Sequence, residues 1–287
     1  MMKQAIREHR VIARPRHLLF TGTLAVSLAL AAPLMLLPRS SLAEPASSDL
    51  PAREWMANVQ RAANATTGVA EMRMSLIGPG GRTRHREATA YEKRRANGRM
   101  ARLIRFHSPP EMAGAAVLAL ENVERDDDWW IYIPAYHTTR RIAPANRSDP
   151  YMGTDFSYED LTDLRLDDYD FALMGWETID GIPCRQLEAR PANSAVAEAS
   201  RYGRLRYWID PDRWIYPRAV LYGHDGEPLK EVRNSQPITI DGQWRWSRTE
   251  MHGLRKDHRT ILEIRERRIG EPLPERLFTE RALRRPG

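Results

Sequence analysis

The sequence predicts a mainly β protein of the α+β type, built on one antiparallel, strongly curved sheet with few helices. Strand-like runs recur along most of the 287 residues, and Asn-Gly and Asp-Gly dipeptides, which favour tight hairpin turns, separate several of them. No glycine-rich phosphate loop follows a strand, and strands do not alternate with helices. A Rossmann-type or barrel-type α/β fold is therefore disfavoured.

One helix is expected near the start of the folded body. It opens at Asp49 or Pro51 and runs to about Ala65, because apolar residues recur there at the spacing of one helix face. The residues of that face are Trp55, Met56, Val59, Ala62 and Ala63.

About ten or eleven strands are expected after Gly68. In the first strand, apolar side chains occupy the even positions from Ala70 to Leu76. Asp180-Gly181, Asp225-Gly226 and Asp241-Gly242 are expected to form two-residue type I′ turns. The strand-like runs span residues 69–76, 84–94, 99–106, 116–121, 129–134, 184–189, 205–209, 218–222, 229–234, 244–252 and 260–269.

Two segments break this pattern. Ser148–Asp168 is expected to be a loop that contains a short helix, capped by Thr154 or Asp155. The C-terminal tail is expected to close the sheet with an apolar plug formed by Leu277 and Phe278.

The first 43 residues have the pattern of a secretory signal peptide. Basic residues up to Arg16 precede the uncharged run Leu18–Leu37, and Ser41-Leu42-Ala43 supplies the small residues of a cleavage site. The alternative is an uncleaved transmembrane anchor, since about 20 apolar residues can span a bilayer. No cysteine lies near the cleavage site, so a lipid anchor there is excluded. We expect a cleaved signal peptide over residues 1–43 and a single periplasmic domain over residues 44–287.

The net charge of +6 does not indicate nucleic-acid binding, because most of the excess lies in the leader. After Ala43, 38 Lys and Arg face 37 Asp and Glu, so the body is nearly neutral. A hydrophobic content of 42% is sufficient for a core. The single cysteine, Cys184, excludes an intramolecular disulfide and a cysteine-rich metal site, and we expect it to be buried in a strand.

No cofactor, metal site or catalytic residue is expected. Asp126-Asp127-Asp128 lacks the spacing of a calcium-binding loop and is interpreted as a solvated hairpin tip. No pair of histidines has the spacing of a zinc site. Asp155, Glu159 and Asp160 offer the paired carboxylates that a glycoside hydrolase needs, but acids at a helix start more often complement the helix dipole. An extracytoplasmic hydrolase stays a disfavoured alternative.

Eight aromatic residues fall between Phe106 and Tyr158, interleaved with arginines. Because the body is nearly neutral and exported, stacking on RNA bases is disfavoured. Two interpretations stay open: the aromatic residues pack a core, or they line an apolar cavity with an arginine rim that is suited to acyl chains. Trp130 and Tyr132 share one face of their strand, and we expect this face, rather than the face of Trp129, to line the cavity.

Three stretches follow one another in a characteristic order. They are Trp130-Ile131-Tyr132-Ile133-Pro134-Ala135, then Arg140-Arg141-Ile142, then Tyr151-Met152-Gly153-Thr154-Asp155-Phe156-Ser157-Tyr158-Glu159-Asp160-Leu161. This series resembles the outer-membrane lipoprotein-sorting proteins, the LolA-like family of periplasmic lipoprotein carriers. The resemblance extends over most of residues 50–280.

The resemblance implies an incomplete antiparallel β-barrel wrapped around a few helices, without catalytic activity. It implies a periplasmic monomer whose cavity binds acyl chains of lipoproteins or lipids for transfer toward the outer membrane. An inner-membrane transporter is a further partner that it suggests, and an accessory protein of an inner-membrane exporter is the alternative function. Ser148–Asp168 is expected to form part of a lid or rim. The residues expected to contact lipid are Phe106, Trp130, Tyr132, Arg140, Arg141, Met152, Phe156, Tyr158 and Leu161.

Overall fold

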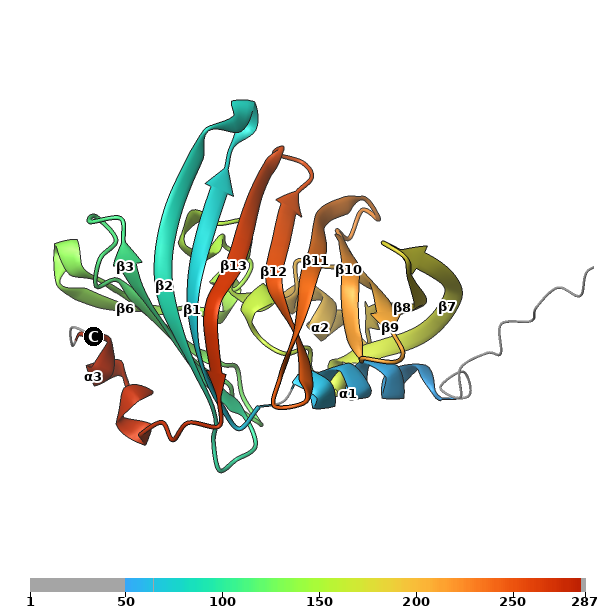
Figure 1. Ribbon diagram of the computed structural model, residues 1–287, viewed down its shortest axis with the longest axis horizontal. Helices are drawn as coiled ribbons and strands as arrows, with labels where there is room; N and C mark the ends of the chain where they lie inside the picture. The colour runs from blue at the N-terminus through green and yellow to red at the C-terminus, as the bar shows by residue number, and fades with distance from the viewer. Residues whose placement is uncertain (1–49, 64, 285–287) are drawn as a thin grey trace, which may run out of the picture. The chain divides into compact units, whose positions relative to one another are not determined.

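The computed structural model describes residues 50–63 and 65–284, so the expected signal peptide lies outside the described residues. In the described part of the chain, 13 antiparallel strands form one open, curved sheet in the order β6-β5-β4-β3-β2-β1-β13-β12-β11-β10-β9-β8-β7 (Figure 1). The strands are β1 (Thr67–Ile77), β2 (Thr83–Arg94), β3 (Met100–Ser108), β4 (Ala116–Leu120), β5 (Asp128–Ile133), β6 (Thr138–Ile142), β7 (Tyr169–Ile179), β8 (Ile182–Pro191), β9 (Arg204–Asp210), β10 (Ile215–Tyr222), β11 (Pro228–Ile240), β12 (Gln243–Gly253) and β13 (His258–Ile269). The expected mainly β class is confirmed.

Three α-helices accompany this sheet in the described residues: α1 (Ala52–Ala63), α2 (Ser194–Ala199) and α3 (Glu280–Leu283). The predicted first helix is therefore confirmed, and its Trp55 is fully buried with edge-on contacts to Trp176 and Trp214. In this part of the chain every helix is too short or too polar to span a lipid bilayer.

The expected count of ten or eleven strands is too low, because β6 and β7 were missed. Both are edge strands, each paired on one side only. The sequence of β6 has no apolar alternation, whereas β7 alternates only over its first half, where half-buried Tyr169, Phe171 and Leu173 are separated by exposed residues. Most residues of β6 are exposed, and β7 has only Ile179 buried.

Two of the three predicted type I′ turns are confirmed. Asp180-Gly181 and Asp241-Gly242 have positive φ at both residues, between 49° and 82°. The prediction for Asp225-Gly226 is wrong, because only Gly226 has a positive φ. There the Gly223 N–H donates to the Glu227 carbonyl, which makes the loop longer than two residues.

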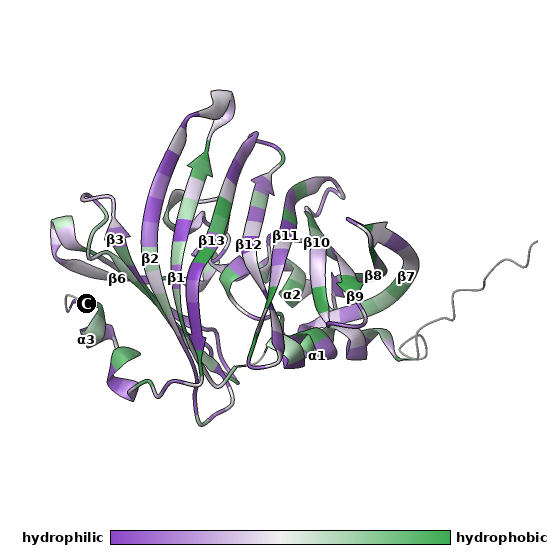
Figure 2. Ribbon diagram, in the orientation of Figure 1, coloured by the Kyte–Doolittle hydropathy of each residue, from purple (hydrophilic) through white to green (hydrophobic). Residues whose placement is uncertain are grey.

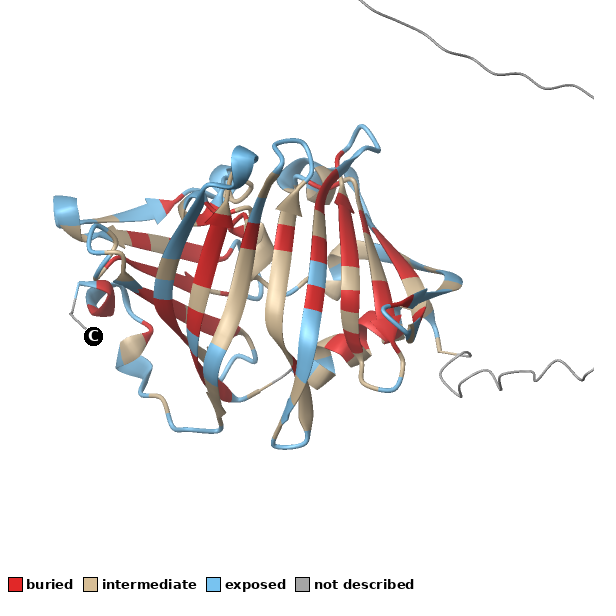
Figure 3. Ribbon diagram, turned by 45° about the horizontal axis from the view of Figure 1, so that its top comes forward, coloured by how far each residue is buried: buried red, intermediate tan, exposed pale blue. Residues whose placement is uncertain are grey.

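The two faces of the sheet are covered by different segments. The inner face carries the even-numbered residues from Ala70 to Leu76, which are buried as predicted, and α1 packs on its β7–β10 end. The outer face is covered beside β3–β5 by the C-terminal segment. Apolar and polar residues alternate along most strands (Figure 2). Buried residues gather in the strands toward the two ends of the strand order, whereas the central strands β12 and β13 are mostly half-buried (Figure 3).

A long connection, residues 143–168, crosses the inner face, and we call it the strap. It has to cross because it joins β6 to β7, which are opposite edges of the sheet (Figure 1). The short helix predicted in this segment is wrong: the strap contains only three-residue 3₁₀ turns, such as Tyr151–Gly153 and Glu159–Leu161. Its polar groups bond to the sheet instead of to a helical backbone.

The predicted C-terminal plug is confirmed. Phe278 and Leu283 are buried against Leu103 and Leu118 on the outer face, and Leu277 packs beside them. The buried guanidinium of Arg105 donates to the carbonyl of Ala282 at 2.9 Å, which fixes α3 on the strands.

Truncating the plug should destabilise the fold without touching the inner face. We expect Phe278→Ala to lower the free energy of unfolding by about 3–5 kcal/mol, because it removes a buried aromatic ring. Urea unfolding monitored by circular dichroism measures this, with the exposed neighbour Arg281→Ala as control. A loss below about 1 kcal/mol for Phe278→Ala would show that the tail does not stabilise the sheet.

Candidate functional site

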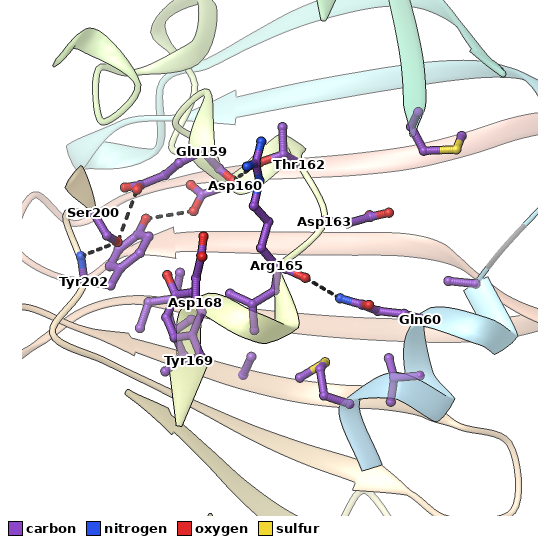
Figure 4. A pocket seen from close by; sticks show the side chains of 18 of the residues that line it. Gln60, Glu159, Asp160, Thr162, Asp163, Arg165, Asp168, Tyr169, Ser200 and Tyr202 are labelled. Carbon is purple, nitrogen blue, oxygen red and sulfur yellow. Dashed lines mark hydrogen bonds between the residues drawn. The ribbon is translucent and has the colours of Figure 1, made fainter. Parts of the chain in front are cut away.

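A cavity of about 590 Å³ lies between the inner face, α1 and the strap. This volume is within the range of about 300–1,000 Å³ that is typical of small-molecule sites. Residues from β2, β3 and β9–β13 line it together with α1, α2 and the strap (Figure 4). The cavity therefore depends on elements that are far apart in the sequence.

One side of the cavity is apolar. Strand side chains at alternate positions form its floor, since residues two apart on a strand point to the same face. From above, Met56 and Val59 of α1 and Leu164 of the strap complete the apolar wall. The floor residues are Leu205, Tyr207, Tyr216, Ala219, Leu221, Val232 and Met251.

The strap is anchored beside the cavity by the buried carboxylate of Asp160 (Figure 4). Lys230 on β11 donates to this carboxylate at 2.6 Å, and the Tyr202 hydroxyl donates at 2.8 Å. Ser157 of the strap donates to it from both its amide and its hydroxyl. Every oxygen of Asp160 thus has a donor, and the carboxylate ties the strap to the sheet.

A second anchor lies at Asp155. Its carboxylate accepts from the hydroxyl of the fully buried Thr260 and contacts His258 Nδ1, both at 2.7 Å. The Asp155 amide also donates to the Thr260 hydroxyl. The sheet therefore engages both Asp155 and Asp160, two of the three acids on which the hydrolase alternative rested.

The other side of the cavity is charged. Arg102 on β3 binds Asp163 of the strap at 3.0 Å and also pairs with Glu121, while Arg165 binds Asp127 at 2.7 Å. The interpretation of residues 126–128 as a solvated tip is therefore wrong for Asp127 and Asp128, which are buried and ion-paired. Hydrogen bonds from Arg125 are the main reason why the pKa of Asp128 falls to about 2. No metal-binding group of His, Cys, Asp or Glu side chains occurs in the described residues.

Five of the nine residues that the sequence assigned to lipid lie on the inner face. Phe106 is fully buried beneath Tyr151 of the strap, and Tyr158 packs edge-on against Trp129. The other three, Met152, Phe156 and Leu161, pack partly buried against the same cluster. These residues hold the strap on β3–β5, and none of them is among those lining the cavity.

The remaining four residues lie away from the cavity as well. Trp130 and Tyr132 face the outer side of β5 and pack near the C-terminal plug, whereas Trp129 is buried on the inner face. The expectation that Trp130 and Tyr132 face inward is therefore wrong. Arg140 is exposed, and Arg141 donates to Asp128 at 2.5 Å. Contact of any of the nine with lipid stays a prediction.

Sequence reasoning missed the cavity floor. Leu205 and Tyr207 on β9, like Ala219 and Leu221 on β10, alternate as a half-buried strand should. That period-two signal predicts strands, but it does not show which strand faces meet around a cavity. Cys184 is buried in β8, as predicted, and burial raises its pKa to about 12.

Comparison with known proteins places this fold in a family. A DUF1329 family protein from Desulfovibrio piger is 28% identical, with a TM-score of 0.75 over 81% of this chain and 97% of that one. A domain from Vibrio parahaemolyticus, named for outer membrane lipoprotein sorting, is 24% identical with the same TM-score, over 82% of this chain and 100% of that one. A LolA superfamily protein from Nitrosomonas europaea reaches 0.64 at 17% identity, over 81% of this chain and 99% of that one. None of the curated proteins matches this chain.

A family model described as an uncharacterized protein matches residues 98–285, well over half of the chain. The chain belongs to the family that this model describes. Its open sheet of 13 strands is the LolA-like half-barrel that the motifs between residues 130 and 161 indicated.

Removing the Lys230 ammonium group, which pairs with Asp160, should weaken the attachment of the strap to the sheet. We expect Lys230→Met to lower the free energy of unfolding by about 3–5 kcal/mol, because it leaves a buried carboxylate without its counter-ion. Urea unfolding measures the loss, and Lys256→Met, at an exposed turn position, is the matched control. Equal stabilities of the two variants would contradict the anchoring role.

The strap should also respond to pH through Glu159. Burial and the neighbouring Asp160 raise its pKa, so folding favours its protonated form. The stability of the wild type relative to Glu159→Gln should therefore be highest below about pH 4.3, the usual value for Glu. It should fall as the pH rises through the raised pKa of the folded state.

Urea titrations at a series of pH values, with the exposed Glu198→Gln as control, measure this difference. A difference between wild type and Glu159→Gln that grows with rising pH would contradict the burial of this carboxyl.

Proposed function

We propose that this protein is a periplasmic carrier that holds an acyl chain of a lipid or lipoprotein in the cavity beneath the strap. The observation that carries this proposal is the composition of the cavity: an apolar floor from β9–β12, closed by apolar residues of α1 and the strap, beside a charged wall. Such a division suits a molecule with an apolar chain and a polar end.

The energetics support binding of a long chain. Each methylene moved from water to an apolar site is worth about 0.8 kcal/mol, so one long acyl chain contributes on the order of 10 kcal/mol. A carrier also has to release its cargo. The part of the strap that walls the cavity is suited to that step, because it is held there by discrete polar contacts, such as Lys230–Asp160 and Gln60 to the Leu164 carbonyl.

Transfer toward the outer membrane is the direction that we propose, with lipoprotein or lipid as cargo. The Vibrio domain that shares this fold is named for lipoprotein sorting, and this supports the proposal. The pattern of the first 43 residues supports a cleaved signal peptide and periplasmic location. We propose that the carrier acts as a monomer without catalytic activity.

A second candidate function rests on the two sheet edges. β6 and β7 each leave one side without a partner strand in the described structure, and Met174 on β7 is 40% exposed. Free strand edges can pair with another chain. This favours docking on an inner-membrane exporter as an alternative role for the protein.

Filling the cavity mouth should abolish acyl binding. Ala199 on α2 lines the cavity yet is exposed, so Ala199→Trp is expected to fold normally while its indole occupies the entrance. We expect its affinity for a pyrene-labelled fatty acid, measured by fluorescence titration of delipidated protein, to fall by about tenfold or more, since about 1.4 kcal/mol of lost contact suffices.

The matched control is Glu198→Trp, which adds the same ring next to Ala199 at a position that does not line the cavity. It should bind like the wild type. If wild type, Ala199→Trp and Glu198→Trp bind the probe equally, the acyl chain does not occupy this cavity.

A further inference from the structure

We propose that the cavity also contains an anion site, formed by Arg245 on β12 and Arg267 on β13, which binds the carboxylate or phosphate of an anionic amphiphile. The inference rests on the proposed function, because the acyl chain of the same molecule would lie on the apolar floor. Both arginines line the cavity.

A β-bulge puts Arg267 in this position. On β13, Thr260, Leu262 and Ile264 pair with inner-face residues of β1 in steps of two. The register then shifts, so that Arg265 is skipped and Arg267 pairs with Ala70 of the inner face. Without the bulge, Glu266 would continue the inner row, because side chains alternate strictly along a regular strand. The irregularity replaces an acid by a base inside the cavity.

The second guanidinium, that of Arg245, is buried and fixed. It donates to the carbonyls of Ala62 and Ala63 at 2.7 and 3.0 Å, and thereby caps the C-terminal end of α1. It also donates to the Trp244 carbonyl and the Gln243 side chain, so Arg245 contributes its charge to the site and Arg267 supplies the free donors. Burial and the nearby positive charge of Arg267 both lower its pKa. The two arginines are thus close enough to repel each other.

The charge of Arg267 has no counter-ion in the described part of the chain. Its side chain makes no ion pair or hydrogen bond there, and its Nε atom is buried without a partner. The negative charge of Glu92 acts on Arg245, but the Glu92 carboxylate already pairs with Arg102 at 3.5 Å. Arg267 is half-buried, and a charge partly withdrawn from water favours a partner of opposite sign. An oxyanion of the ligand would supply the missing partner and bind through charge-assisted hydrogen bonds.

Carboxylate and phosphate groups both meet this requirement, and an uncharged head group does not. The ligand class is therefore an acyl chain with an oxyanion at one end, from a fatty acid or a lysophospholipid. Three probes with the same palmitoyl chain separate the contribution of the anionic head group from that of the acyl chain. They are palmitate, palmitoyl-lysophosphatidylglycerol and the neutral monopalmitin.

The test measures dissociation constants of the three probes for the delipidated full chain, by displacement of a fluorescent acyl probe. We expect the wild type to bind the anionic probes more tightly than monopalmitin, and the tighter of the two identifies the head group. Arg267→Gln should weaken anionic binding by about tenfold or more while changing monopalmitin binding by less than about twofold. Arg267→Lys, which keeps the charge, should retain most of the preference.

The control is Arg265→Gln, which removes the same charge from the exposed bulge residue and should change nothing. The anion site is overturned if the wild type binds all three probes equally, or if Arg267→Gln weakens monopalmitin as much as palmitate. Binding of none of the three would overturn the proposed carrier function together with the anion site.

Discussion

The attachment of the strap to the inner face is the interaction on which the rest of the structure depends. Since β6 and β7 are opposite edges of one open sheet, the segment that joins them must span the sheet. Asp160 and Asp155 hold it there through Lys230 and Thr260, which are 70 and 105 residues away in sequence. These bonds fix the strap across the sheet, and together with α1 it covers the apolar residues of β9–β12.

The strap in turn divides the inner face into two parts with different roles. Beside β3–β5, its aromatic residues Tyr151 and Tyr158 pack so closely on Phe106 and Trp129 that the region is filled. Beside β9–β12, it meets α1 through the bond from Gln60 to the Leu164 carbonyl and leaves a cavity. The packed part of the strap fixes the position of the part that walls the cavity. The sequence motif and the candidate site are therefore neighbours, and of the Tyr151–Leu161 stretch only Glu159 and Asp160 line the cavity.

Local patterns in the sequence were sufficient for most of the sheet and insufficient for the site. Alternation predicted strands such as β1 and β10, and Asp-Gly pairs predicted two of its turns, because these signals act over a few residues. The edge strand β7 carries this signal only over its first half, where Tyr169, Phe171 and Leu173 share one face. The cavity arises from pairs that are distant in sequence, such as Lys230 with Asp160, and from a bulge that turns Arg267 inward. No spacing rule encodes either of these.

The central claim is that the protein carries an acyl chain under the strap. Native mass spectrometry of the protein purified from the periplasm, followed by solvent extraction, tests it most directly. The account predicts a bound species that adds the mass of one acyl-bearing molecule and appears in the extract. A protein that has only its own mass, and keeps it after incubation with lipoprotein and phospholipid, would contradict the claim and favour the exporter accessory.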